Sequence, residues 1–443
     1  MESITVIGGG LAGCEAAWQI AKRGVPVKLY EMKQERFSPA HKSPGLAELI
    51  CSNSLKAARI ESAAGLLKEE MRRLGSLLMD CAGRCSVPAG GALAVDREEF
   101  SRLATEAIEG EPLIELCRRE ITEIPGGVTV IASGPLTEGG LAGEIEKLCG
   151  GRLSFFDAAA PIVTAESIDM TKCFAASRYG RGEDDYINCP MNKEEYERFV
   201  TELVGAERAP LHGCDASSPE GGSSEDPKVY EGCMPIEVLA SRGRDAIRFG
   251  PMKPVGLTDP RTGHRPWAVV QLRAENRERT LYNLVGFQTN LKFGEQKRVF
   301  GMIPGLLNAE FMRYGVMHRN TFLDSPRVLD ADYSLRTRPE LFFAGQMTGV
   351  EGYMESAASG MLAGINAVKR RHGQETLVLP GTTMIGALSR YIAGYEGKDF
   401  QPMGANFGIL PPLPTHIRDK RERYAGLSKR ALLDLGKEIS CAL

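Results

Sequence analysis

The stretch Ile4-Thr5-Val6-Ile7-Gly8-Gly9-Gly10-Leu11-Ala12-Gly13 opens a unit that ends at Glu31. Ile4 to Ile7 predicts a short buried strand. An apolar helix follows, Gly24 closes it, and Val25 to Tyr30 predicts a second strand. In such a unit Gly8 makes a tight turn, Gly10 lets the backbone approach a pyrophosphate, and Gly13 lets helix and strand pack closely. Glu31 stands where a carboxylate would hold a ribose 2′-hydroxyl. The unit predicts a dinucleotide-binding fold.

A second strand and glycine loop lies near the C-terminal end. Leu341 to Ala344 reads as a buried strand, and a loop with Gly345, Gln346, Gly352 and Tyr353 follows it. The loop feeds a helix rich in small residues, whose N-terminus we expect to approach a flat cofactor closely. Val128 to Gly134 predicts a further buried strand that ends in glycine, as in flavoproteins with two dinucleotide motifs.

These patterns predict an α/β protein with a Rossmann-like FAD-binding domain of two motifs. An α+β insertion interrupts this domain, and a mainly helical segment ends the chain. The expected boundaries are 1–154 and 322–372 for the two parts of the FAD-binding domain, 155–321 for the insertion and 373–443 for the C-terminal segment. We expect Gly205 to Lys228, rich in Gly, Ser and Pro, to be a solvent loop.

Composition narrows the class of protein. The 443 residues carry a net charge of −3, which argues against non-specific coating of nucleic acid but permits a local basic face. No apolar run approaches the roughly 18 residues that span a bilayer, and the first residues lack the layout of a secretory signal. We therefore expect a cytoplasmic protein with no membrane partner. The eleven cysteines are odd in number and form no CxxC pair, so free thiols are expected, and the six histidines show no metal-ligand spacing.

Two cysteines share a similar context. Cys51 precedes Ser52-Asn53-Ser54, which we interpret as the N-cap of a helix, and Cys233 precedes Pro235, which suits a first helical position. A thiol at a helix N-terminus is favoured as thiolate. The alternative for either cysteine is an inert core thiol. Beside a flavin, two thiolates suit disulfide reduction or addition to an electron-poor ring such as uracil, where attack at C6 makes C5 nucleophilic.

Seven motifs together resemble those of the folate- and FAD-dependent tRNA (uracil-54-C5) methyltransferases, the TrmFO family, over essentially the whole chain. They are Cys51-Ser-Asn-Ser54, Phe156-Asp-Ala-Ala-Ala-Pro161, Ser167-Ile-Asp-Met170, Ala176-Ser-Arg-Tyr179, Glu231-Gly-Cys-Met-Pro-Ile-Glu237, Gln271-Leu-Arg273 and Tyr314-Gly-Val-Met-His-Arg-Asn-Thr321.

The resemblance implies that FAD lies against Gly8, Gly9, Gly10, Leu11, Ala12, Gly13, Glu31 and Gly134, with Gly345, Gln346, Gly352 and Tyr353 at its flavin end. It also implies methylenetetrahydrofolate as one-carbon donor, NADPH or NADH as reductant and the T-loop uridine 54 of tRNA as acceptor. By resemblance Cys233 activates uracil at C6, and Cys51 acts beside the flavin as the base that removes the C5 proton.

Folate and RNA contacts are less determined by the sequence. We expect His318 to stack on the folate pterin and Tyr353 to cover the flavin. Arg97 and Arg273 are candidates for the folate glutamate tail or an RNA phosphate. Arg242 and Arg244 belong to a candidate RNA face at Arg242 to Lys253, to which Lys292 to Arg298 and the basic C-terminal helix are further candidates. We expect a monomer without an obligate protein partner.

Two rival functions remain open from the sequence. One is a GidA-like flavoprotein that modifies wobble uridine with a GTPase partner. The missing C-terminal helical domain of GidA and the presence of the Cys233 motif argue against it. The other is a flavoprotein that binds RNA or NAD(P)H without methylating.

Overall fold

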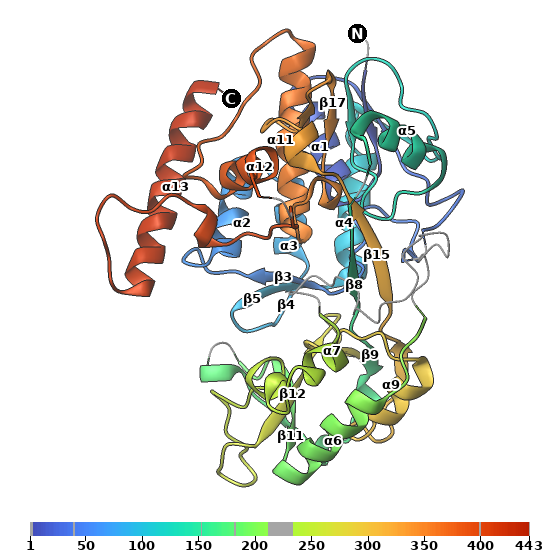
Figure 1. Ribbon diagram of the computed structural model, residues 1–443, viewed down its shortest axis with the longest axis vertical. Helices are drawn as coiled ribbons and strands as arrows, with labels where there is room; N and C mark the ends of the chain where they lie inside the picture. The colour runs from blue at the N-terminus through green and yellow to red at the C-terminus, as the bar shows by residue number, and fades with distance from the viewer. Residues whose placement is uncertain are drawn as a thin grey trace.

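The computed structural model describes residues 3–38, 40–151, 153–180, 183–210, 234–397 and 400–442. Figure 1 shows two bodies of structure, with the N-terminal and C-terminal helices gathered in one and the second sheet in the other. Most of the predicted solvent loop, from residue 211 onward, and Cys233 lie outside the described residues.

The first body is organised around a six-stranded sheet in the order β16-β17-β7-β1-β2-β6. All neighbouring strands run parallel except the edge pair β16–β17. The strands are β1 Ile4–Ile7, β2 Val27–Tyr30, β6 Ile114–Cys117, β7 Thr129–Ile131, β16 Ser334–Leu335 and β17 Arg338–Phe343. The strand from the second glycine motif thus pairs with β7 beside β1, which joins two segments far apart in sequence.

Helices cover this sheet, and α1 and α11 pack directly on each other (Figure 1). Gly360 and Gly364 of α11 allow the close approach, because a Cβ at these positions would lie 2.0 Å from the Ala12 carbonyl oxygen and 2.6 Å from that of Ala16. The helices of this body are α1 Leu11–Ala21, α2 Ala63–Arg73, α3 Leu77–Arg84, α4 Arg97–Glu109, α5 Gly139–Cys149, α10 Ser325–Val328, α11 Tyr353–Arg371, α12 Met384–Gly394 and α13 Lys420–Ala442.

The small residues of α11 were expected to bring its N-terminus close to the cofactor. The approach of this N-terminus to a cofactor stays a prediction, and two of the small residues have a different contact. The glycines lie further along the helix, and the space that they leave is filled by the backbone of α1.

The second body contains a six-stranded antiparallel sheet in the order β10-β11-β12-β13-β9-β14 with its own apolar core. Its strands are β9 Ile162–Thr164, β10 Phe174–Ala175, β11 Tyr186–Met191, β12 Ala268–Ala274, β13 Leu281–Leu284 and β14 Phe311–Arg313. Its helices are α6 Lys193–Gly205, α7 Ile236–Ser241, α8 Ala246–Phe249 and α9 Phe293–Phe300. The antiparallel sheet with helices agrees with the α+β character expected of this region.

Two smaller sheets lie near the junction. β8 Leu153–Ala158 pairs antiparallel with β15 Met317–Phe322, so the chain enters and leaves the second body through adjacent strands (Figure 1). β3 Ser54–Ala57, β4 Ser86–Val87 and β5 Ala92–Val95 form the other sheet. The α/β class with a parallel sheet and an inserted second sheet is confirmed, while the exact domain boundaries stay a prediction.

Candidate active site

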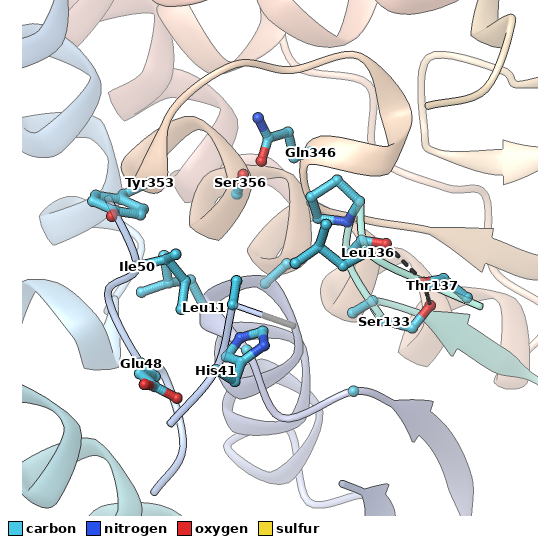
Figure 2. A pocket seen from close by; sticks show the side chains of 18 of the residues that line it. Leu11, His41, Glu48, Ile50, Ser133, Leu136, Thr137, Gln346, Tyr353 and Ser356 are labelled. Atoms are coloured by element: carbon cyan, nitrogen blue, oxygen red, sulfur yellow. Dashed lines mark hydrogen bonds between the residues drawn. The ribbon is translucent and has the colours of Figure 1, made fainter. Parts of the chain in front are cut away.

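A cavity of about 400 Å³ opens where the two glycine motifs meet. Its walls come from the β1–α1 turn, the chain after β2, the end of β7 and the start of α11 (Figure 2). Eleven of the predicted cofactor or catalytic residues line it: Gly8, Gly10, Leu11, Ala12, Glu31, Cys51, Gly134, Gly345, Gln346, Gly352 and Tyr353. The fold therefore brings both predicted motifs to one cavity.

The first glycine loop has the geometry that its sequence predicts. Gly8 has a φ of +104°, and a Cβ there would lie 2.5 Å from the Ala132 carbonyl oxygen. A Cβ at Gly13 would lie 1.7 Å from the Gly8 carbonyl oxygen, so only glycine permits this contact between helix and strand. A Cβ at Gly10, by contrast, would have no heavy atom within 4 Å. The space in front of Gly10 belongs to the cavity.

The start of α1 suits a phosphate. No side chain caps the helix at Gly10, and its first turn contains no acidic residue. The first N–H groups of a helix lack partners within the helix, and together with the helix dipole they favour an anion. The open side of Gly10 and the uncapped helix fit the pyrophosphate of a dinucleotide such as FAD.

Glu31 lies at the other side of this turn. Its Oε2 accepts the Gly9 N–H at 2.9 Å, and its Oε1 accepts the Lys33 N–H at 2.9 Å. The carboxylate therefore fixes the glycine loop and still borders the cavity. Each carboxylate oxygen has a second lone pair, so a ribose hydroxyl can still donate to it.

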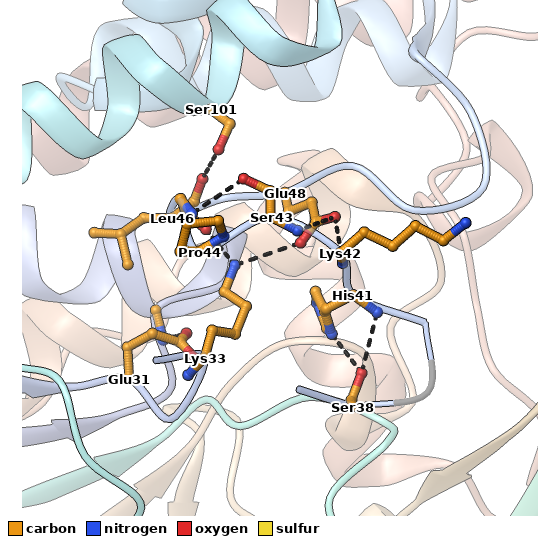
Figure 3. Close-up of polar contacts among 12 residues, drawn as sticks. Glu31, Lys33, Ser38, His41, Lys42, Ser43, Pro44, Leu46, Glu48 and Ser101 are labelled. Atoms are coloured by element: carbon orange, nitrogen blue, oxygen red, sulfur yellow. Dashed lines mark hydrogen bonds and ion pairs between the residues drawn. The ribbon is translucent and has the colours of Figure 1, made fainter. Parts of the chain in front are cut away.

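The chain between Glu31 and Cys51 forms a polar wall that sequence reasoning treated only as a loop. The Lys33 ammonium lies 3.6 Å from Glu48 Oε2, and His41 Nδ1 lies 2.5 Å from the Ser38 hydroxyl (Figure 3). Burial, with the Lys33 charge, lowers the pKa of His41. The sequence could have indicated this wall, because it places a Lys, a His and a Glu between the predicted site residues Glu31 and Cys51.

The Cys51 thiol meets the Tyr353 hydroxyl at the edge of the cavity, with Sγ 3.0 Å from Oη. That oxygen also accepts the N–H of Cys51 at 2.8 Å and of Ser52 at 3.1 Å. Burial, reinforced by Cys51, raises the pKa of Tyr353 well above its usual range, so the phenol keeps its proton. Because two N–H groups already donate to this oxygen, its hydroxyl hydrogen is free to donate to the Cys51 sulfur, and a hydrogen bond of that direction stabilises a thiolate.

The predicted helix after Cys51 was wrong. Residues Ser54–Ala57 form β3 and pair with β5, and the next helix, α2, begins at Ala63 with Ser62 as its N-cap. The Asn53 amide bonds to the Val95 and Ala274 carbonyls and so holds the segment extended. No helix therefore begins directly after Cys51, and the contact of its thiol is the Tyr353 hydroxyl.

Arg97 and Arg273 support the same segment. Arg97 donates to the Leu49 and Ile50 carbonyls at 2.9 and 3.0 Å and pairs with Glu275 at 2.9 Å. Arg273 is buried and donates to the Asn53 and Ser52 side chains, both at 2.9 Å. Both guanidinium groups bond within the chain. Their contact with a folate tail or an RNA phosphate stays a prediction, and the structure adds a role in holding Cys51.

Comparison with known proteins identifies the family of the chain. The sequence model of the family described as glucose inhibited division protein A, GIDA, matches residues 3–375. A protein of Acetivibrio thermocellus named methylenetetrahydrofolate–tRNA-(uracil-5-)-methyltransferase TrmFO is 58% identical over 442 residues, covering 99% of each chain. A protein of Desulfitobacterium hafniense with the same name is 59% identical over 437 residues, covering 98% of each.

The chain belongs to the GidA family and, within it, to the TrmFO proteins. Among solved structures, Aquifex aeolicus GidA matches with a TM-score of 0.70 at 15% identity. The match covers 99% of this chain and 76% of that one, and at this identity it supports the fold alone.

The second glycine motif forms the wall opposite α1 in this TrmFO-family chain. The Gly345 N–H donates to the Ser359 hydroxyl at 2.7 Å, and the Gln346 amide donates to Glu351 at 2.7 Å. Gly352, with a φ of +124°, leads into α11, and Gly134, with a φ of +82°, turns the chain after β7. These residues border the cavity as expected of a cofactor site.

For some of the remaining predicted residues, the structure describes only the backbone or nothing at all. His318 lies on β15, where its backbone pairs with Asp157, and its side chain is outside the described part. Cys233 is outside it as well. Pro235 is the N-cap of α7 rather than its first residue, and the Ile236 N–H donates to the carbonyl of Gln288, which lines the cavity. Arg242 and Arg244 are exposed after α7.

The described residues contain neither a metal-ligand cluster nor a helix suited to span a membrane. Within the ranges that the structure covers, no cluster of three or more His, Cys, Asp or Glu side chains is arranged to hold a metal ion. Within the same ranges, no helix combines the length and apolar character needed to cross a membrane.

Proposed function

We propose that this protein methylates C5 of uridine 54 in the T-loop of tRNA, with methylenetetrahydrofolate as one-carbon donor and FAD reduced by NADPH or NADH. The observation that carries the proposal is the thiol of Cys51, held by Tyr353 at the edge of a cavity that both glycine motifs line. Membership of the TrmFO proteins supports the same chemistry.

The residues present fit FAD. Gly10 and the start of α1 would hold its pyrophosphate, and Glu31 a ribose hydroxyl. Gly345, Gln346 and Tyr353 would surround its ring end. When bound, FAD would supply the reducing equivalents that turn a methylene unit into a methyl group.

The two cysteines would divide the work on the uracil ring. We propose that the Cys233 thiolate adds to C6, which places negative charge on C5 and makes that carbon the nucleophile. Cys51 would then remove the C5 proton once C5 carries the new carbon. Loss of the proton would break the bond between the new carbon and its carrier and leave an exocyclic methylene at C5. Addition of a hydride to that carbon would form the methyl group, and the electrons returned to C5 would expel the Cys233 thiolate from C6 and restore the C5–C6 double bond.

Tyr353 positions Cys51 for this step. Its hydroxyl fixes the Cys51 sulfur and two backbone N–H groups at once. A sulfur that receives a hydrogen bond is poised as a base, and after it takes the C5 proton the contact can reverse.

The other predicted contacts stay part of this proposal. His318 would stack on the pterin, Arg242 and Arg244 would contact RNA, and the chain would act as a monomer without a protein partner. The boundaries 1–154, 155–321, 322–372 and 373–443 are proposed as the domain limits.

The test uses the purified protein alone with an unmodified tRNA transcript, NADPH, and methylenetetrahydrofolate labelled in its one-carbon unit. We expect label in 5-methyluridine of the T-loop. If the flavin is reduced by NADPH but no label enters RNA until a GTPase partner is added, the wobble-modifying function replaces this one.

A further inference from the structure

Three aromatic rings stack on one another at the surface of the second body. The rings of Phe293 and Tyr314 lie 4.7 Å apart with an angle of 15°, and those of Phe311 and Tyr314 lie 5.2 Å apart with an angle of 8°. Phe293 is the first residue of α9, Phe311 is the first residue of β14, and Tyr314 directly follows β14. Phe293 is 55% exposed, so the stack ends in a ring face open to solvent.

Apolar side chains next to the stack in sequence are exposed too. Met312, between the two ring residues, is 64% exposed. Exposed apolar groups gathered at one place usually mark a binding surface. We call the surface formed by Phe293, Phe311 and Tyr314 the aromatic face.

The aromatic face is rigid. The Gln296 amide of α9 donates to the Gly315 carbonyl at 2.8 Å and accepts the Gly315 N–H at 2.8 Å. A Cβ at Gly315 would lie 2.5 Å from Thr289 Cγ2 and 2.7 Å from the Ala159 carbonyl oxygen. The residue after Tyr314 is therefore fixed to α9, and the rings are held before any ligand arrives.

Arg313 lies within the same segment and is largely removed from solvent. Among the residues that the structure describes, it has no hydrogen-bond or ion-pair partner, in contrast to Arg97 and Arg273. Burial and, after it, the charge of Arg97 lower the pKa of Arg313. Tyr353, Glu275 and Cys51 act in the opposite direction and raise it. Arg313 is thus a partly buried cation that directly precedes Tyr314 in the sequence, and such a group gains from an anion.

The cations of α9 differ in how they are paired. Arg298 is bound by Glu202 at 2.5 Å and Glu295 at 2.8 Å, and Lys292 is bound by Glu207 at 2.5 Å. Lys297 is exposed and has no ion-pair partner within the described ranges. The positive charge available beside the aromatic face therefore comes from Arg313 and Lys297.

We propose that the aromatic face and Arg313 bind the RNA substrate, with an unpaired base stacked on Phe293 and a neighbouring phosphate on the Arg313 guanidinium. Stacked flat rings, next in sequence to a guanidinium that has no partner among the described residues, match the flat bases and the charged backbone of a looped-out RNA segment. The chain after Gly315 continues into β15, whose Asn320 lines the cavity. The face thus leads toward the site. This inference rests on the proposed function and names where its RNA docks.

The experiment measures binding of an unmodified tRNA transcript to the FAD-loaded protein at several salt concentrations. Arg313→Gln is expected to weaken binding and to reduce the slope of log K against log salt concentration by about one, as loss of one phosphate contact does. Phe293→Ala is expected to weaken binding roughly tenfold with little change in slope, and Phe293→Trp to retain it. Arg102→Gln is the charge-matched control, because Arg102 on α4 is exposed and paired with Glu99 and Glu106.

Several outcomes would overturn the inference. One such outcome is that the Arg313→Gln protein binds tRNA with unchanged affinity and salt slope. Another is that the substitution raises only the KM for methylenetetrahydrofolate, which would assign Arg313 to the folate. Phe293→Ala could abolish a dimer seen by sedimentation, which would make the face a contact between two copies. FAD content and thermal unfolding show that each variant is folded. If the wild-type protein neither binds nor methylates tRNA, the proposed function fails; if it does both and the variants match it, only this inference fails.

Discussion

The Tyr353 hydroxyl is the contact that bears most directly on the proposed role of Cys51. It lies within hydrogen-bond distance of the Cys51 sulfur and of the backbone N–H groups of Cys51 and Ser52. Sequence reasoning found both residues but assigned their roles differently: it placed Cys51 at a helix end and Tyr353 over the flavin. The contact joins positions about 300 residues apart, and no local pattern encodes such a contact.

Tyr353→Phe tests this role. The ring stays, so FAD should still bind, but the thiolate loses its donor and two N–H groups lose their acceptor. We expect Cys51 to be alkylated by iodoacetamide only at higher pH than in the wild type, and methyl transfer to fall. The pH profile of Cys51 alkylation, read by peptide mass spectrometry, measures the shift.

Tyr391→Phe serves as the control, because the Tyr391 hydroxyl bonds only to the Gln401 carbonyl, away from the cavity. An unchanged alkylation profile in Tyr353→Phe would mean that the hydroxyl does not control the thiol.

At the scale of elements, the turn between β1 and α1 separates two uses of glycine. Gly13 is required by the protein itself, whereas the space in front of Gly10 is left for a ligand. Gly10→Val should therefore give folded, colourless protein without FAD, and Gly13→Val should fail to fold. Absorbance of FAD together with circular dichroism distinguishes the two effects. Stoichiometric FAD in Gly10→Val would place the pyrophosphate elsewhere.

The contact of α1 with α11 joins the two halves of the cofactor site. Gly360→Ala would force a Cβ to within 2.0 Å of the Ala12 carbonyl oxygen and should lower the free energy of unfolding by about 1–3 kcal/mol or more. Gly83→Ala, in α3, meets no atom within 4 Å and should be neutral or stabilise by about 0.5–1 kcal/mol. Denaturant unfolding measures both. Equal effects would show that α1 and α11 adapt to the extra atom.

Many of the helices, strands and turns near the site could be predicted from the sequence. The strand, glycines, helix and acid of residues 4–31 follow local rules, and so does the Asp96 N-cap of α4, since Asp is a preferred N-cap residue. The chain around Cys51 was misjudged because Ser and Asn also favour turns and strand ends when partners from other elements are present. Those partners, β5 and the end of β12, lie far along the chain.

At the scale of the whole molecule, the second body is inserted through one pair of strands. Ala158 of β8 lies opposite Met317 of β15, so residues 159–316 leave and return at adjacent points. Replacing them with an Asn-Gly turn would close a hairpin. We expect this shortened protein to fold, bind FAD and lose methyl transfer. Insoluble, colourless protein would show that the first body depends on the second and would contradict the proposed domain limits.

In the proposed reaction, a thiolate makes C5 of one tRNA uridine reactive, and the C5 proton then leaves. A tRNA transcript with tritium at C5 of its uridines measures this directly. With methylenetetrahydrofolate and NADPH, we predict release of about one equivalent of tritium per tRNA into water. Release should disappear in Cys233→Ala protein that still holds FAD, and with a transcript that has cytidine at position 54. Tritium release from the cytidine-54 transcript, or undiminished release by Cys233→Ala, would contradict the account.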